Sequence, residues 1–162
     1  MQSKPEIEDW YQTPDPWGYE TNPDDMLRKQ KILNALPGTY KRALDIGCGE
    51  GWITKDLPAK VIHGLEWSDN ARARIPKPVV AVTEPSGKYD LVVLTGVLYP
   101  QYDFQTIGRL AEKHLAKGGT LLMCHIEDWL QLLPGKIDAV LEHQERFPYR
   151  QYTELLERYK CV

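Results

Sequence analysis

The stretch ALDIGCGEG, residues 43–51, decides the fold of this chain. A short apolar run leads into GCGEG, residues 47–51, and glycine lets a backbone turn sharply and lets a ligand lie against it. The pattern predicts a strand, a tight turn and a helix whose first N–H groups are free. Asp45 stands two residues before the first glycine, and Glu66 follows nineteen residues after it. We therefore expect a ligand site at this turn, with two carboxylates beside it.

The position of Glu66 indicates a ligand that contains a nucleoside. A carboxylate at the end of the strand after the turn can accept hydrogen bonds from both hydroxyls of a ribose. Dinucleotides typically pair with GxGxxG, whereas the spacing here is GxGxG. Asp45 would repel a pyrophosphate but suits an ammonium group. S-adenosylmethionine carries adenine, ribose, an ammonium and a sulfonium without phosphate, so it fits better. A glycine-rich turn without a ligand is the remaining alternative.

Short apolar runs alternate with helical patterns along the chain. Five runs lack polar–apolar alternation, as expected for strands that are covered on both faces. They are residues 43–46, 61–66, 78–82, 89–95 and 120–125. Helices are predicted over 23–36, after an Asn22 cap, and over 103–115. Strands that alternate with helices predict an α/β fold with a mostly parallel sheet.

The C-terminal part of the sequence has a less regular pattern. Residues 128–133 fit a short helix, and 137–147 fit a strand or a helix. Four residues with helical spacing predict a helix over 150–159; they are Tyr152, Leu155, Leu156 and Tyr159. We therefore expect a sheet shortened at its C-terminal strands. Because an exposed strand edge invites pairing, we expect either a homodimer through the edge beside 120–125 or a tail folded over it.

Length, composition and charge limit the class of protein. The 162 residues suit one compact domain, and 42% hydrophobic and 27% charged residues are typical of a globular chain. No apolar run is long enough to span a bilayer, and the N-terminus shows no secretory signal. Three widely spaced cysteines form no CxxC pair, so we expect no metal site and a cytoplasmic location. Basic residues form no concentrated stripe, so neither nucleic acid nor a membrane is an expected partner.

Residues 1–22 are expected to form an N-terminal arm ahead of a single domain at 23–162. Three prolines and an acidic excess disfavour helix over 1–21. The arm carries four aromatic residues, too much apolar surface to leave in water; they are Trp10, Tyr11, Trp17 and Tyr19. We expect the first two to pack on the domain and Trp17 to belong to a lid over a ligand pocket.

Several motifs resemble those of the Rossmann-like S-adenosylmethionine-dependent methyltransferases. They are ALDIGCGEG (43–51), LEWS (65–68), YDLVVLTGVLY (89–99) and LAKGGTLLM (115–123). The segment DPWGYETNPDD (15–25) resembles the nodulation-protein S group, which N-methylates a sugar amine. The resemblance covers about residues 15–125. It implies a three-layer αβα sandwich, S-adenosyl-L-methionine as cofactor, S-adenosyl-L-homocysteine as product and a small-molecule acceptor.

The resemblance also assigns residues to the methionine part of the cofactor. Asp45 and the three glycines of the turn, Gly47, Gly49 and Gly51, would flank it, with the backbone of Cys48 alongside. A second group would lie at its amino acid end. That group comprises Thr95 and Gly96 at the end of the fourth strand, together with Trp17 and Arg28. Arg28 either meets the cofactor carboxylate or is a solvated helix residue.

Other residues are assigned by the resemblance to the adenosine part. Glu66 would hold the ribose, Trp67 would cover one adenine face, and Ser68 would lie near the same ring. Thr83 and Glu84 follow the third strand, where the family contacts the adenine edge. The family more often has aspartate than glutamate there, which leaves the contact of Glu84 open.

Methyl transfer depends mainly on in-line placement of nucleophile, methyl and sulfur. A base is needed only where the nucleophile loses a proton. Tyr99 and His125 follow or end predicted strands and are the candidate catalytic residues. A partly buried polar group with a structural role is the alternative for each. The absence of an NPPY-type tetrapeptide after the fourth strand argues against methylation of amines in DNA.

Three functions are therefore compatible with the sequence. The leading one is a methyltransferase that acts on nitrogen or oxygen of a small molecule. The second is a cofactor-binding module without turnover, and the third is a nicotinamide-dependent oxidoreductase.

Overall fold

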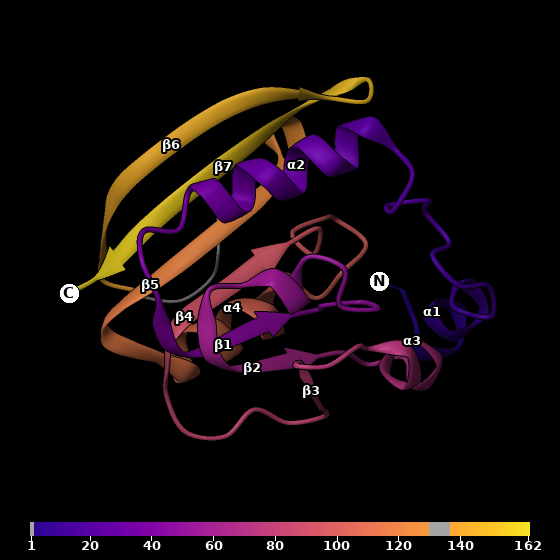
Figure 1. The fold of residues 1–162 in the computed structure, drawn as a ribbon, viewed down its shortest axis with the longest axis horizontal. Helices are drawn as coiled ribbons and strands as arrows, with labels where there is room; N and C mark the ends of the chain where they lie inside the picture. The colour runs from indigo at the N-terminus through magenta and orange to yellow at the C-terminus, as the bar shows by residue number, and fades with distance from the viewer. Residues whose placement is uncertain (1, 130–136) are drawn as a thin grey trace.

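A seven-stranded sheet forms the centre of the computed structural model, which describes residues 2–129 and 137–162 (Figure 1). The strands are β1 (Tyr40–Ile46), β2 (Ala59–Leu65), β3 (Val80–Val82), β4 (Tyr89–Thr95), β5 (Leu115–Ile126), β6 (Ala139–Tyr149) and β7 (Tyr152–Cys161). Their order is β3-β2-β1-β4-β5-β7-β6. The first five strands pair in parallel, and β7 is antiparallel to both β5 and β6. The predicted α/β fold with a mostly parallel sheet is confirmed.

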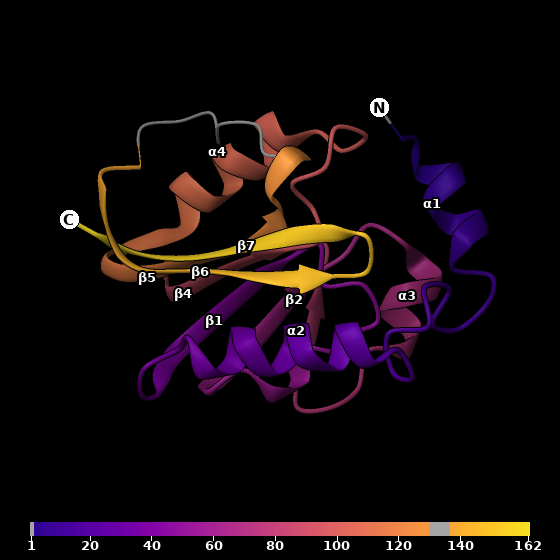
Figure 2. The same ribbon diagram turned by 90° about the horizontal axis from the view of Figure 1, so that it is seen from above.

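Helices cover both faces of this sheet. They are α1 (Lys4–Trp10), α2 (Pro23–Asn34), α3 (Asp69–Arg74) and α4 (Phe104–His114), with 3-10 turns η1 (Thr54–Asp56) and η2 (Glu127–Trp129). Figure 2 shows α2 on one side of the sheet and α4 on the other, so the predicted three-layer sandwich is confirmed. The helices α1 and α3 lie together at one end of the molecule (Figures 1 and 2). In the described residues, no helix is both long and apolar enough to cross a membrane.

The local sequence explains where α2 begins and what it covers. The Asn22 side chain accepts a hydrogen bond from the Asp24 N–H at 2.9 Å, and Pro23 occupies the first turn, as predicted. Ile32 is fully buried and packs, with Leu36, against residues of β1, β4 and β5. On the opposite face, Ala111 of α4 packs into a second apolar cluster. Burial on both faces is why the central strands appear in the sequence as continuous apolar runs.

The C-terminal residues form a β-hairpin, so the predicted helix over 150–159 is wrong. The hairpin strands are β6, which settles the ambiguity at 137–147, and β7. Four consecutive residues from Glu154 to Glu157 are buried, because both faces of β7 are covered: Leu156 belongs to one apolar cluster, and Tyr159 packs against the other. The alternation that marks a strand is therefore hidden. Of the predicted helix at 128–133, residues 130–133 lie outside the described residues.

The hairpin adds two strands to the sheet, so the expected shortening of the sheet at its C-terminal strands is wrong. β7 pairs along β5 from Thr120 to Ile126, so this edge is not free for the predicted homodimer. The other expectation, a tail folded over this edge, is confirmed. The outer strands of the described sheet are β3 and β6.

Two further expectations about helices are corrected. Residues 4–10 of the arm are helical because Pro5 lies in the first turn, where it costs no hydrogen bond, and because the Ser3 N–H donates to Glu6 at 2.7 Å. The glycine turn leads into the three-residue turn η1 rather than into an α-helix.

Candidate functional site

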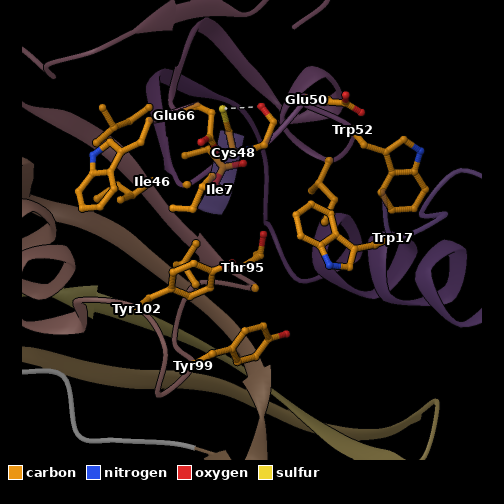
Figure 3. A pocket seen from close by; sticks show the side chains of 18 of the residues that line it. Ile7, Trp17, Ile46, Cys48, Glu50, Trp52, Glu66, Thr95, Tyr99 and Tyr102 are labelled. Carbon is orange, nitrogen blue, oxygen red and sulfur yellow. Dashed lines mark hydrogen bonds between the residues drawn. The ribbon is translucent and has the colours of Figure 1, made fainter. Parts of the chain in front are cut away.

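A cavity of about 220 Å³ lies at the carboxyl ends of β1, β2 and β4. This is the edge where parallel α/β sheets bind their ligands. The N-terminal arm lines the cavity through residues such as Tyr11 and Trp17. Figure 3 shows Trp17 and Trp52 on one side and Tyr99 and Tyr102 on another, with Thr95 between them.

The glycine turn brings bare backbone to the cavity. Gly47 has a φ of +77°, and a Cβ there would lie 2.3 Å from Val97 Cγ1. Gly49 has a φ of +56°, and a Cβ there would lie 2.7 Å from the hydroxyl oxygen of Tyr11. No other residue type fits these two positions without displacing a neighbour. The turn therefore presents its backbone, rather than side chains, to whatever enters.

Asp45 is a buried carboxylate at the end of β1. Its Oδ2 accepts a hydrogen bond from the Thr54 hydroxyl at 2.6 Å. Its Oδ1 is also buried, but it has no hydrogen-bond partner among the described residues. Burial raises the pKa of Asp45 to about 7, although the Thr54 hydrogen bond and the nearby Arg28 oppose this rise. The buried Oδ1 of Asp45 can therefore accept a hydrogen bond from a donor of a ligand.

Arg28 of α2 is the cationic residue that lines the cavity, and it is 3% exposed. Its Nε lies 3.1 Å from Oε1 of Glu154, an ionic contact that lacks the angles of a hydrogen bond. Its Nη2 has no hydrogen-bond partner within residues 2–129 and 137–162. A Cβ on Gly96 would lie 3.3 Å from Nη2, which places the guanidinium at the end of β4. Burial alone would lower the pKa of Arg28, but Glu154 raises it above its ordinary value.

Glu66 at the end of β2 is held by backbone groups. Its two oxygens accept hydrogen bonds from the N–H groups of Gly49 and Ser68, both at 2.9 Å. Burial raises the pKa of Glu66, and these hydrogen bonds counteract part of the rise. Each oxygen retains a lone pair, so the carboxylate can still accept from a ligand hydroxyl. Trp67 follows at the rim and is 45% exposed.

The N-terminal arm is fastened beside this site. Glu8 accepts hydrogen bonds from the Ser68 hydroxyl at 2.9 Å and from the Asp69 N–H at the start of α3. Tyr11 is buried, and its ring contacts that of Trp17 edge-on at 5.2 Å. The predicted packing of Tyr11 is therefore confirmed, whereas Trp10 remains 42% exposed. Trp17 lines the cavity, as a residue of a lid would.

Four tyrosines line the cavity. They are Tyr11, Tyr19, Tyr99 and Tyr102. The other five tyrosines have hydroxyl partners in the described part of the chain, whereas no hydrogen bond is found there for these four hydroxyls. Burial raises the pKa of Tyr99 and raises that of Tyr102 to about 12. Both phenols are neutral near pH 7, so they can donate or accept hydrogen bonds but are poor bases.

Most of the predicted site residues line this cavity. They are Trp17, Arg28, Asp45, Gly47, Cys48, Gly49, Glu66, Trp67, Thr95, Gly96 and Tyr99. The Cys48 thiol itself packs on the strand, since a Cβ on Gly64 would lie 2.6 Å from its sulfur. These residues come from five elements or loops that are far apart in the sequence, and the fold brings them to one place.

Five predicted residues lie outside the lining. Gly51 packs toward Ile75 and Pro76, and Ser68 is buried as the cap of α3. Thr83 and Glu84 are exposed after the edge strand β3. His125 is fully buried in β5, with Nε2 3.5 Å from a carboxylate oxygen of Glu157. This contact gives His125 a structural environment away from the cavity.

The sequence interpretation missed other residues of the site. Tyr102 lines the cavity just before α4. The only sequence feature that marks it is its aromatic side chain, a few residues after the end of a strand. Glu154 contacts Arg28 from β7, and its signal was lost because a helix was expected there. No group of three or more His, Cys, Asp or Glu side chains among the described residues is arranged to hold a metal ion.

Comparisons with known proteins can now be set beside this geometry. A family model described as a methyltransferase domain matches residues 21–161. No curated protein sequence matches the chain. Similar solved structures include the N-methyltransferase NodS from Bradyrhizobium japonicum WM9 in complex with S-adenosyl-L-homocysteine. That structure has 19% identity and a TM-score of 0.80, over 98% of this chain and 97% of that chain.

Two further structures show the same fold. The magnesium protoporphyrin IX methyltransferase ChlM from Synechocystis PCC 6803, with bound SAM, has 17% identity and a TM-score of 0.69, over 100% of this chain and 98% of that chain. A putative methyltransferase from Pseudomonas syringae has 20% identity and a TM-score of 0.67, over 84% and 97%. Because the family model covers most of the sequence, this chain belongs to the methyltransferase-domain family.

Proposed function

We propose that this protein is an S-adenosylmethionine-dependent methyltransferase that acts on nitrogen or oxygen of a small molecule. One observation carries the proposal: two buried atoms of opposite charge, Asp45 Oδ1 and Arg28 Nη2, belong to residues of one cavity and have no hydrogen-bond partner among the described residues. Buried charged groups are costly unless a partner satisfies them. A ligand with one ammonium and one carboxylate, such as the methionine part of S-adenosylmethionine, would satisfy both.

The remaining groups fit the rest of that cofactor. Asp45 would hold the ammonium, Arg28 the carboxylate and Glu66 the ribose hydroxyls, with the Trp67 ring beside the adenine. NodS and ChlM, which share the fold, are described in complex with S-adenosyl-L-homocysteine or SAM, and this supports the assignment.

A nicotinamide dinucleotide fits this cavity less well. Pyrophosphate is usually bound by the free N–H groups and positive dipole at the start of an α-helix. The glycine turn here leads only into the short turn η1. Arg28 is the cation among the described residues that line the cavity, and Glu154 already neutralises it, whereas Asp45 beside the glycine turn would repel a pyrophosphate.

The residues of the chain would contribute placement rather than acid–base chemistry. The bound cofactor supplies a methyl group activated by its sulfonium. Asp45, Arg28 and Glu66 would fix the orientation, and orientation of two reactants can supply roughly 7–11 kcal/mol of the barrier. The neutral hydroxyl of Tyr99 would orient the acceptor by a hydrogen bond, and Trp17 would exclude water. The arm covers the cavity, which favours a small acceptor over a polymer.

Binding and turnover test the proposal separately. By calorimetry, the wild type should bind S-adenosylhomocysteine but not NADH. Asp45→Asn and Glu66→Gln should each weaken binding by about tenfold or more, since each removes a charge-assisted hydrogen bond. Glu157→Gln, which changes a buried carboxylate outside the cavity, should bind normally. Unchanged binding in both site variants would contradict the proposal. Screening amines, phenols and sugars with labelled S-adenosylmethionine would distinguish an enzyme from a module that only binds the cofactor.

A further inference from the structure

We propose that Glu154 is a positioning residue that holds the Arg28 guanidinium apart from Asp45 and thereby keeps the subsite for an amino acid zwitterion open. The inference rests on the proposed function, because the zwitterion is the methionine part of S-adenosylmethionine. It assigns a role in the cofactor site to the C-terminal hairpin, whose residues do not themselves line the cavity.

The cavity contains two buried side chains of opposite charge that do not pair with each other. Arg28 and Asp45 carry opposite charges, are 3% and 1% exposed, and line the same space. The Arg28 charge lowers the pKa of Asp45 against the effect of burial, so the two groups are within electrostatic reach. Yet they form no ion pair within 4 Å, and each keeps an atom without a hydrogen-bond partner in the described chain. Opposite charges in a low-dielectric site attract each other strongly. A third group that binds one of the two would keep them apart.

Glu154 has the contacts needed to do so. Its Oε1 lies 3.1 Å from Arg28 Nε, and its Oε2 accepts a hydrogen bond from the Cys124 thiol at 2.8 Å. The residue is fully buried and lies in β7 opposite Ile126 of β5 and Phe147 of β6, so its backbone is fixed on both sides. The carboxylate thus holds the Nε side of the guanidinium and leaves Nη2 toward Gly96 and the cavity.

The ring of Tyr149, in the same hairpin, supports this placement. Its centroid lies 5.6 Å from Arg28 Cζ, close enough for a cation–π contact. Asp25 of α2 is buried nearby but already pairs with Arg150 and Tyr149, so without the charge of Glu154 the guanidinium would be free to pair with Asp45 in the shared cavity. Pairing of Arg28 with Asp45 would occupy the atoms that the ammonium and carboxylate of the ligand need. The subsite for the amino acid group would then be blocked, whereas the residues proposed to bind the adenosine part would be unchanged.

A comparison of two ligands tests this role. S-adenosylhomocysteine carries the amino acid group, and 5′-methylthioadenosine lacks it. In the wild type, the first should bind more tightly than the second. In Glu154→Gln, affinity for S-adenosylhomocysteine should fall about tenfold or more, the scale expected for charge-assisted hydrogen bonds, while affinity for 5′-methylthioadenosine should change less than about twofold. The ratio of the affinity for S-adenosylhomocysteine to that for 5′-methylthioadenosine should therefore fall. General loosening of the fold would lower both affinities and leave their ratio unchanged.

Glu157→Gln is the matched control. Glu157 is a buried carboxylate of the same strand that pairs with His125 and lies away from the cavity. Its loss should leave the affinity ratio at the wild-type value. A ratio that is unchanged or raised in Glu154→Gln would overturn the inference. Failure of the wild type to bind either ligand would instead overturn the proposed function, so the two failures are distinguishable.

A double-mutant cycle shows whether Glu154 acts through Arg28. In the Arg28→Gln background, Glu154→Gln should cause no further change in the affinity ratio, because the group that it positions is gone. If Glu154→Gln alone does not fold, Glu154→Asp replaces it in the cycle, since it keeps the charge but withdraws it by one methylene. Glu154→Asp should lower the ratio when Arg28 is present and leave it unchanged when Arg28 is absent. Any other result contradicts a positioning role.

Discussion

The glycine turn and the C-terminal hairpin serve the same cavity in different ways. The turn at 45–51 shapes the cavity with its own backbone, through positive φ angles and the absence of side chains at Gly47 and Gly49. The hairpin acts at a distance, because Glu154 and Tyr149 contact Arg28, which in turn lines the cavity. A local motif thus shapes the backbone of the cavity, whereas long-range strand pairing places the buried group that contacts its cation.

The largest effect should come from a side chain in the glycine turn. Gly47→Ala would combine an unfavourable φ of +77° with a Cβ only 2.3 Å from Val97 Cγ1. We expect a loss of about 4 kcal/mol in the free energy of unfolding, since backbone strain and overpacking each cost about 1–3 kcal/mol. Urea unfolding followed by circular dichroism measures the loss.

Gly38→Ala is the control for the backbone part of this loss. Gly38 has a φ of +78°, but a Cβ there meets nothing within 4 Å. Its loss should be about 1–2 kcal/mol, the cost of a left-handed residue alone. Equal losses in the two variants would show that contact with Val97 contributes nothing, and the distinction between turn and hairpin would lose its steric basis.

The next effect separates stability from ligand binding at Asp45. Asp45→Asn removes a buried charge that has an unpartnered oxygen in the described structure. In the absence of ligand we expect this variant to be more stable than the wild type by up to about 4 kcal/mol at pH 8, because the pKa of Asp45 is raised from 3.8 to about 7. The same variant should bind S-adenosylhomocysteine poorly. Thermal unfolding with and without ligand measures both effects.

The pH dependence of this difference follows from the raised pKa of Asp45, about 7 against an ordinary value of 3.8. Below about pH 4 both folded and unfolded chains hold the proton, so the wild type is not penalised. Between pH 4 and 7 the unfolded chain releases the proton first, and wild-type stability falls. The advantage of Asp45→Asn should therefore grow from pH 4 to pH 7 and then level off. A constant advantage across this range would argue against a raised pKa for Asp45.

The two regions also differ in how far the sequence predicts them. The strand, the turn and Glu66 could be predicted because their signals are local: an apolar run, three glycines and a fixed spacing. The start of α2 at Asn22-Pro23 was equally local. By contrast, β7 was mistaken for a helix, because Leu155 and Leu156 are buried on opposite faces of the sheet and hide the period of a strand.

The residues of the candidate site are also only partly predictable from the sequence. Asp45 and Gly47 were found from the motif, and their roles there remain predictions. The choice between a cofactor contact and a solvated position for Arg28 could not be made from the sequence. It depends on Glu154, which is 126 residues later in the chain and is adjacent only after β7 pairs with β5. His125 was considered because it ends a strand, but its side chain meets Glu157, which the expected helix had placed elsewhere.

A smaller effect tests how the hairpin is attached to α2. The Tyr149 hydroxyl donates to Asp25 Oδ1 at 2.7 Å, and Asp25 is fully buried. Tyr149→Phe leaves that oxygen without this donor and should cost about 1–2 kcal/mol. The ring over Arg28 is retained, so ligand affinity should not change. Tyr159→Phe is the control: its hydroxyl donates to Glu157, which also accepts from Gln144, so its loss should be smaller. A loss of ligand affinity in Tyr149→Phe would mean that attachment and charge positioning are not separable.

The smallest effect should come from the outer side of the hairpin. Arg146 of β6 pairs with Glu127 at 2.7 Å, but its side chain is 52% exposed. Exposed ion pairs contribute little because water and salt screen them, so Arg146→Ala should cost less than about 0.5 kcal/mol. Urea unfolding at 0.05 and 0.5 M salt measures this, and the small difference from the wild type should shrink further at high salt. A loss above about 1 kcal/mol would mean that the exposed face of the hairpin also holds it in place, and the buried contacts to Arg28 and Asp25 could then no longer be regarded as its main attachment.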